Sequence, residues 1–206
     1  MIWLKNSSFC QMPLFEEIYH KVFELLQARL PAYLTYHSPQ HTSYVLEKAE
    51  FIARHENISE DDLSLIKLAA LFHDAGFIRQ YKGHEEAGCE IATEYLEDYS
   101  VDAGDIDQIC KIIMATRTPQ SPSNLNERIM CDADLEYLGT DLFFSVSKLL
   151  FQELQYMDPN LDEKTFREIQ INFLQNHIYH TSYCKENREG KKKENLQVLL
   201  MQGDNL

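Results

Sequence analysis

The sequence predicts an all-α protein. Leu, Ile and Ala recur at helical spacing through long segments, and runs that alternate apolar with polar residues, as strands do, are almost absent. Only 7 Gly and 6 Pro occur among 206 residues. Because we find neither a linker nor a repeat, we expect one domain over residues 1–206. Its core should cover about 34–157, with a helix at 13–30 and helices at 162–201 packed on it.

Charge and cysteine content narrow the class of protein. The formal net charge is −14, and an acidic surface repels phosphate backbones, so we expect no long nucleic acid as partner. The five cysteines are scattered without a CxxC pair, which is typical of reduced thiols in a cytoplasmic protein. No segment has the length of a membrane span or resembles a signal peptide, so we expect no membrane partner. A homodimer is compatible with the sequence.

The first elements lead to two histidines. A helix at 13–30, ended by Pro31, has the apolar spacing of a packing helix. A turn around Pro39 follows, and the next helix places His41 on its apolar stripe, so this side chain points inward. His37 lies in the turn, where its position fits either an exposed residue or the lip of a site.

The next helix ends in the most informative stretch, His73-Asp74. It begins at Ser59, which with Asp62 forms a capping-box pattern, and Gly76 helps to end it. His73 shares a face with Leu63, Ile66 and Ala70, so it too points inward. A buried imidazole beside a buried carboxylate needs a partner. A hydrogen-bonded core histidine is one explanation, but a second inward histidine on another helix favours a divalent metal ion.

Further polar residues follow in order. Glu85 and Glu86 suit the start of a helix, whereas His84 lies one loop from the central pair and lacks such an explanation. After a helix at 102–115 and a polar loop, an apolar run carries Asp132 and Asp134. Two helical residues that are two positions apart point to nearly opposite sides, so only one should reach a shared centre. Packing helices are then expected at 142–157, 162–179 and 186–201.

The order of these residues resembles the HD-domain superfamily of metal-dependent phosphohydrolases, whose pattern is H…HD…D. The Tyr-His-x-x-x-His stretch at 36–41 is similar to the opening signature of cyclic-nucleotide phosphodiesterases. The stretches at 131–139 and 179–195 look like a bacterial family of predicted HD-superfamily phosphohydrolases. The resemblance covers about Leu34 to the C-terminus and implies an all-α, HD-domain/phosphodiesterase-like helical bundle.

The resemblance also implies a site. The divalent ion (Mn, Fe, Ni, Mg or Zn) would be held by His41, His73 and Asp74, with Asp134 favoured as fourth ligand and Asp132 left open. His37 takes the role of general acid, with His84 as the other candidate donor. His84 also matches the first extra histidine of two-metal members, but Thr116 stands near the second such position, which argues against a full second metal site. The candidate catalytic residues are therefore His37, His84 and Asp74, and the candidate substrate-binding residues are Arg79, Lys82, Glu85, Thr116 and Arg117.

The expected function is hydrolysis of a small phosphate ester, a nucleotide or a phosphodiester, by metal-activated water. Arg79, Lys82 and Arg117 lie in adjoining loops and suit phosphate binding, although each also fits ordinary surface charge. Two alternatives are a metal-containing nucleotide-binding or regulatory module without turnover, and a helical scaffold with a structural His-Asp cluster. His37 and His84 favour the hydrolase, because binding alone needs no proton donor.

Overall fold

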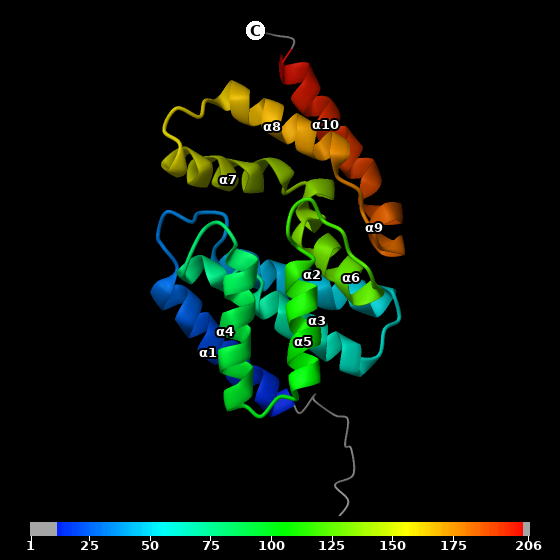
Figure 1. Ribbon diagram of the computed structural model, residues 1–206. Coiled ribbons are helices and arrows are strands. Elements are labelled where there is room, and N and C mark those ends of the chain that lie inside the picture. Colours follow the sequence, from blue (N-terminus) through cyan, green and yellow to red (C-terminus); the bar gives the residue numbers. More distant parts are fainter. Residues whose placement is uncertain (1–11, 204–206) are drawn as a thin grey trace, which may run out of the picture.

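The computed structural model describes residues 12–203, which contain helices and no strand, so the all-α prediction is confirmed. Helices α1 to α6 form one body, and α7, α8 and α10 lie together over one end of it (Figure 1). The elements are α1 (Met12–Arg29), α2 (Pro39–His55), α3 (Glu60–Phe72), η1 (Ala75–Ile78), α4 (His84–Asp98), α5 (Ala103–Met114), α6 (Leu125–Asp134), η2 (Glu136–Gly139), α7 (Phe143–Met157), α8 (Glu163–Asn176), α9 (Ser182–Asn187) and α10 (Glu189–Gly203).

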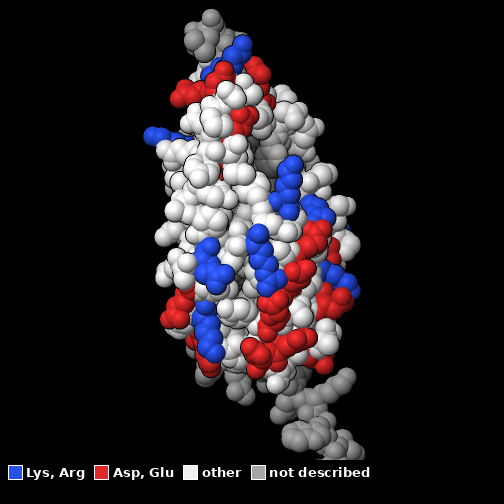
Figure 2. Space-filling view, turned by 60° about the vertical axis from the view of Figure 1, so that its left-hand side comes forward, with Lys and Arg blue, Asp and Glu red and all other residues white. Residues whose placement is uncertain are grey.

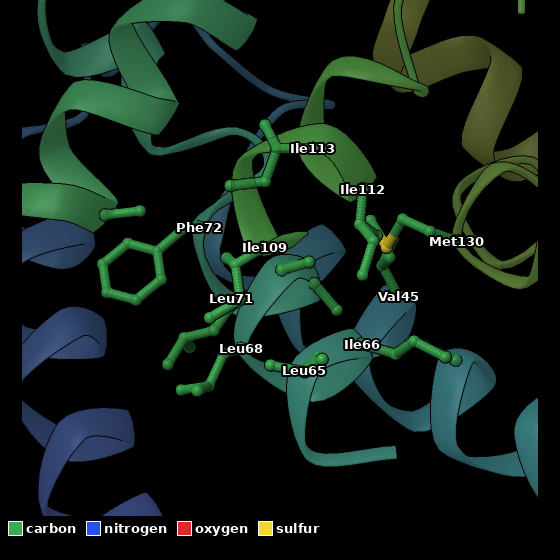
Figure 3. Packing of buried hydrophobic residues seen from close by; sticks show 14 of the residues in the cluster. Val45, Leu65, Ile66, Leu68, Leu71, Phe72, Ile109, Ile112, Ile113 and Met130 are labelled. Carbon is green, nitrogen blue, oxygen red and sulfur yellow. The ribbon is translucent and has the colours of Figure 1, made fainter. Parts of the chain in front are cut away.

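Helix α3 is the centre of the larger core. From Leu63 to Phe72 every side chain except Lys67 is buried, which is the pattern of a helix surrounded by others. Figure 3 shows its apolar residues packed against those of α2, α5 and α6, among them Ile109 and Met130. Because α3 runs through the core, the residues at its C-terminal end emerge inside the protein and not at its surface.

Capping side chains fix where the helices that lead to the site begin. The Ser59 hydroxyl accepts the backbone N–H of Asp62 at 3.1 Å, so the predicted cap of α3 is present. Ser38 caps α2 by accepting the N–H of His41 at 3.4 Å, with Pro39 in the first turn. A hydroxyl that accepts an otherwise unpaired N–H of the first turn stabilises that helix end.

Gly76 brings η1 close to α4. A Cβ atom at this position would overlap the backbone carbonyl of His84 and the backbone N–H of Gly88. Only glycine allows this approach without moving one of the two elements. The start of α4, which carries His84, is thereby held next to Asp74 at the end of α3.

A second, smaller cluster of buried residues joins the C-terminal helices to η2. It consists of Tyr36, Leu135, Tyr137, Leu138, Phe143, Leu174 and Leu199. The buried amide of Asn195 on α10 donates to the carbonyls of Leu138 and Thr140 at 2.9 and 3.0 Å. Glu136 on η2 pairs with Arg188 and accepts the hydroxyl of Tyr44. These contacts position α7 and α8 over the end of the α1–α6 body.

The C-terminal region differs from the prediction of two helices, at 162–179 and 186–201. Three helices form there, because α8 ends at Asn176 and the short helix α9 precedes α10. The chain is extended after His177, which lets the backbone N–H groups of His180 and Thr181 reach the carboxylate of Asp132. Thr181 then caps α9. The extended segment thus pairs with a buried carboxylate on α6, a contact that helical periodicity does not reveal.

On the face shown in Figure 2, basic side chains lie in separate places beside acidic ones and form no continuous basic surface. Cys89, Cys110, Cys131 and Cys184 are free, and Cys10 lies outside the described residues. Within residues 12–203, no helix combines the length and the apolarity that crossing a membrane requires.

Candidate metal centre

Four side chains from three helices converge near the centre of the molecule. His41 comes from the first turn of α2, His73 and Asp74 follow α3, and Asp134 ends α6. The Nε2 atom of His41 lies 3.1 Å from Oδ1 of Asp134 and 3.5 Å from Oδ2 of Asp74. The Nε2 atom of His73 lies 3.1 Å from Oδ2 of Asp74 and 3.7 Å from Oδ1 of Asp134.

The donor atoms of this cluster fit a divalent cation. One nitrogen each from His41 and His73 and one oxygen from Asp134 lie within 4.8 Å of one another. Nδ1 of His73 is 2.8 Å from the carbonyl of Ala70, so Nδ1 carries the hydrogen and the lone pair on Nε2 faces the cluster. Nε2 of His73 and Oδ2 of Asp74 are buried without a hydrogen-bond partner. Buried polar atoms of this kind need a ligand, and imidazole with carboxylate suits divalent transition metals.

The electrostatics of the pair also indicate a cation site. Burial disfavours the charged form of His73, but the negative charge of Asp74 outweighs this and raises the His73 pKa to about 9. Burial likewise disfavours the carboxylate of Asp74, yet the charge of His73 holds its pKa well below the usual range. Without a metal ion, His73 is therefore protonated, and a metal ion that binds there would have to displace this proton.

Asp132 and Asp134, the two candidates for the fourth ligand, have different environments. Asp134 lies in the cluster, whereas Asp132 faces away from it and is fully buried. The carboxylate of Asp132 accepts the backbone N–H of His180 at 2.8 Å and the N–H and hydroxyl of Thr181 at 2.8 and 2.6 Å. The structure thus brings Asp134 to the other ligands and gives Asp132 a role in holding the segment between α8 and α9.

His37 lies at the edge of the cluster and has a buried carboxylate as partner. Its Nδ1 atom is 2.5 Å from Oε1 of Glu153 on α7, and the backbone N–H groups of Tyr36 and His37 donate to Oε2 at 3.0 and 3.1 Å. Burial disfavours the protonated ring, but the bond to Glu153 outweighs it and raises the pKa of His37. Since Nδ1 donates to Glu153, Nε2 is the nitrogen available to another molecule.

His84 is a further histidine beside the cluster, and its ring lies next to that of His37. Its ring stacks on Phe77 with centroids 3.9 Å apart, and its Nδ1 is 3.1 Å from the carbonyl of Tyr81. Its Nε2 lies 3.8 Å from Oδ1 of Asp74, so the second histidine beside the cluster also turns Nε2 toward it.

The predicted substrate-binding residues separate into two groups. Arg79 pairs with Glu90 and Glu94 on α4 at 2.9 and 2.7 Å, and the structure does not bring it to the site. The other four line cavities that His84 also lines: Lys82, Glu85, Thr116 and Arg117.

Those four residues differ in how free they are to bind a substrate. Lys82 is exposed beside His37 and His84 in a shallow pocket. Arg117 lines the same pocket but pairs with Glu86 and lies 3.6 Å from Glu85. The hydroxyl of Thr116 donates to the carbonyl of Ile113 at 2.8 Å. Lys82 is therefore the cation of this group that is best placed to meet a substrate.

A deeper cavity of about 460 Å³, called the chamber below, opens beside Asp74 and Asp134 and extends between η2, α7 and α8. The chamber and Glu153 are the two parts of the site that the sequence did not indicate. A possible signal for Glu153 was its spacing: it continues the stripe of Phe143, Val146 and Leu150, where an apolar residue is expected. A charged residue on an apolar stripe is a reason to look for a buried partner.

The comparisons with known proteins agree with this geometry. Residues 40–136 match the family model of the HD domain. No curated protein matches the chain. Solved structures of similar fold include three bacterial proteins. YpgQ of Bacillus subtilis, in complex with ADP, is 17% identical with a TM-score of 0.64 and covers 95% of this chain and 96% of its own.

The other two structures are equally extensive matches. A predicted HD superfamily hydrolase from an uncultured Thermotogales bacterium is 22% identical with a TM-score of 0.56, covering 89% of this chain and 91% of its own. A Lactobacillus plantarum protein is 17% identical with a TM-score of 0.65, covering 93% of this chain and 99% of its own. At these identities the likeness shows the fold, and the family of the matched region follows from the family model. Residues 40–136 of this chain therefore form an HD domain.

Proposed function

We propose that this protein is a metal-dependent phosphohydrolase that cleaves a small phosphate ester. One arrangement carries the proposal: Nε2 of His73 and Oδ2 of Asp74 are buried without a hydrogen-bond partner, and Glu153 holds a further histidine, His37, beside them. A site that only bound a metal ion would need the unpaired donor atoms but would not need His37.

The roles of the residues follow from their contacts. His41, His73, Asp74 and Asp134 would hold the ion, which when bound acidifies water and offsets charge on the phosphoryl group. Their helices position these ligands before substrate arrives, because each side chain emerges from the end of a packed helix.

His37 supplies the proton for the leaving oxygen. Its Nδ1 donates to Glu153, so the protonated ring presents its second hydrogen on Nε2. The carboxylate of Glu153 keeps this ring protonated at higher pH and fixes its orientation, since the same carboxylate binds the backbone of Tyr36 and His37. General acid catalysis of this kind contributes roughly 10²–10⁴ in rate.

Two neighbours complete the phosphate site. Nε2 of His84 faces Asp74 and is placed to bond a phosphoryl oxygen. Lys82 at the shallow pocket adds a positive charge near the substrate's point of entry. The complex of the Bacillus subtilis relative with ADP is the observation that keeps nucleotides among the candidate substrates.

Metal analysis followed by a substrate panel tests the proposal. Protein purified without chelator should hold close to one equivalent of a divalent ion, or regain it from Mn²⁺ or Fe²⁺, and should hydrolyse a member of a panel of nucleotides, phosphodiesters and aryl phosphates. Less than about a tenth of an equivalent, unchanged after metal is added back, would contradict the metal site. A stoichiometric ion without hydrolysis of any panel member would favour the module without turnover.

A further inference from the structure

The chamber has two chemically different ends. At one end it is lined by Asp74, Asp134, His37 and His84, which belong to the candidate metal centre. Most of the remaining wall comes from η2, α7 and α8 and is apolar. It includes Leu138, Phe143, Leu150, Leu154, Phe166 and Phe173. The lining is completed by Tyr36, Tyr81, Glu85, Thr116, Thr118 and Leu135. A cavity of about 460 Å³ is within the range of small-molecule sites, which is roughly 300–1,000 Å³.

Positive charge is missing from this wall. Among the described residues that line the chamber, the charged side chains apart from the histidines are Asp74, Glu85 and Asp134, all acidic. The cations nearest to the site, Lys82 and Arg117, line the shallow pocket instead. An anionic group placed deep in the chamber would lose its hydration without gaining a counter-charge, which is unfavourable.

Hydrogen-bonding groups on the helical wall are also few. Ser147 and Gln170 are the polar side chains that α7 and α8 contribute to the lining, against seven apolar ones. A molecule with many hydroxyl or amide groups would leave most of them unpaired there, whereas an apolar group would be buried favourably.

We infer that the chamber receives the organic group of the substrate, and that the substrate is a phosphate ester of an apolar, uncharged alcohol whose one anionic group lies at the metal centre. This inference rests on the proposed function and narrows it. His37 lines both the chamber and the shallow pocket, so a phosphoryl group beside Asp74 would direct its leaving oxygen toward His37 and its organic group into the chamber. Aryl and medium-chain alkyl groups have the size and chemistry that this wall accepts.

Binding of phosphonates to the metal-loaded protein tests the inference without requiring turnover. Calorimetry would compare methylphosphonate, benzylphosphonate and 4-carboxybenzylphosphonate, which share the metal-binding group and differ in the part that enters the chamber. Benzylphosphonate should bind at least about tenfold more tightly than methylphosphonate, because its ring is buried. The added carboxylate should remove at least about tenfold of affinity, because no cation meets it.

Variants that narrow the chamber show where the ring binds. Leu150→Trp on α7 and Ile169→Trp on α8 should reduce the preference for benzylphosphonate to within about threefold and leave methylphosphonate binding unchanged. Ile169 is 49% exposed, so its substitution should not disturb folding if Leu150→Trp does. Leu149→Trp is the matched control, since Leu149 neighbours Leu150 on the same helix but is 41% exposed and does not line the chamber.

The outcomes separate the inference from the proposed function. Equal binding of the first two phosphonates, a gain in affinity from the carboxylate, no phosphonate binding to metal-loaded protein, or equal effects at Leu149 and Leu150 would each overturn the inference. A ring preference that the chamber variants abolish, in a protein that hydrolyses no ester, would support the inference and refute the proposed hydrolysis. Hydrolysis without a ring preference would support the proposed function and overturn the inference.

Discussion

Glu153→Gln is the substitution that most directly tests the proposed acid. Glu153 is buried on α7 and accepts four hydrogen bonds: from Nδ1 of His37 at 2.5 Å, from the backbone N–H groups of Tyr36 and His37 at 3.0 and 3.1 Å, and from the hydroxyl of Tyr81 at 3.3 Å. Glutamine has nearly the same shape but only one oxygen and no charge. If that oxygen keeps the two backbone bonds, the amide NH₂ faces Nδ1 of His37, which must then accept. The ring would be neutral, with its hydrogen on Nε2.

The expected loss of rate follows from this exchange. A hydrogen bond to a charged partner contributes about 1.5–3 kcal/mol, and each 1.36 kcal/mol is about tenfold in rate, so kcat should fall about 10- to 150-fold. The pKa of His37 should also fall, because the bond to Glu153 is what raises it against the effect of burial. Since the general acid works when protonated, the alkaline limb of the kcat profile should move to lower pH.

The assay compares an alkyl phosphate with 4-nitrophenyl phosphate at fixed metal content. The loss should be large for the alkyl ester and small for the nitrophenyl ester, whose leaving group needs little protonation. In a double-mutant cycle, the double variant should lose about as much rate as His37→Ala alone, because Glu153 acts through His37. Equal losses on both esters, an unmoved alkaline limb or reduced metal content would refute the assignment of Glu153 as the residue that positions the acid.

Three further predictions concern the metal centre and its support. Asp74→Ala should abolish metal binding and hydrolysis while helical circular dichroism persists, since Asp74 follows α3 and does not fill the core. Asp132→Asn should keep the metal but lower the free energy of unfolding by about 1–3 kcal/mol, because one of the N–H or hydroxyl donors of His180 and Thr181 loses its acceptor. Thermal denaturation measures the stability, and elemental analysis measures the metal content. Metal binding at pH 7 should release about one proton per ion, because the His73 pKa of about 9 keeps that ring protonated until the ion displaces the proton. Calorimetry in buffers of different ionisation enthalpy measures this release. The affinity should therefore rise with pH up to about 9 and change little above it.

Helical periodicity and short motifs were sufficient for the parts of the site that lie on regular helices. The apolar stripe of α2 correctly indicated that His41 is buried, and that of α3 did so for His73. The sequence could not decide between Asp132 and Asp134, because α6 ends at Asp134 and the surroundings of both aspartates come from other elements. Asp132 is satisfied by Thr181, 49 residues away, a contact that no local pattern encodes.

Long-range contacts also explain what the sequence missed. The pairing of His37 with Glu153 spans 116 residues, and nothing near either residue names the other. Arg79 seemed suited to bind phosphate from its loop position, but its side chain pairs with Glu90 and Glu94, about two and about three turns into α4. Local sequence gives the charge of such a residue, whereas the packing of η1 on α4 decides what the charge meets.

The site is divided between two parts of the chain, and this division has a consequence for specificity. The four candidate metal ligands lie within 40–136, the region that matches the HD domain, whereas His37 precedes it and Glu153 follows it. Around these two residues, the segment before α2 is fastened to α7: Thr35 donates to the carbonyl of Leu149 at 2.7 Å, and Tyr33 stacks on Tyr156 with ring centroids 4.5 Å apart.

These contacts hold His37 and one wall of the chamber together beside the candidate metal ligands. We expect substitutions along the chamber face of α7, such as at Leu150, to change which organic group fits while the candidate ligands stay intact. Substitutions at Glu153 should change the proposed proton donor and leave the chamber as it is, because Glu153 does not line it. Because the proposed chemistry and the proposed fit depend on different positions of the same helix, we expect Glu153→Gln to lower kcat without changing the preference for benzylphosphonate, and Leu150→Trp to change that preference while metal binding persists.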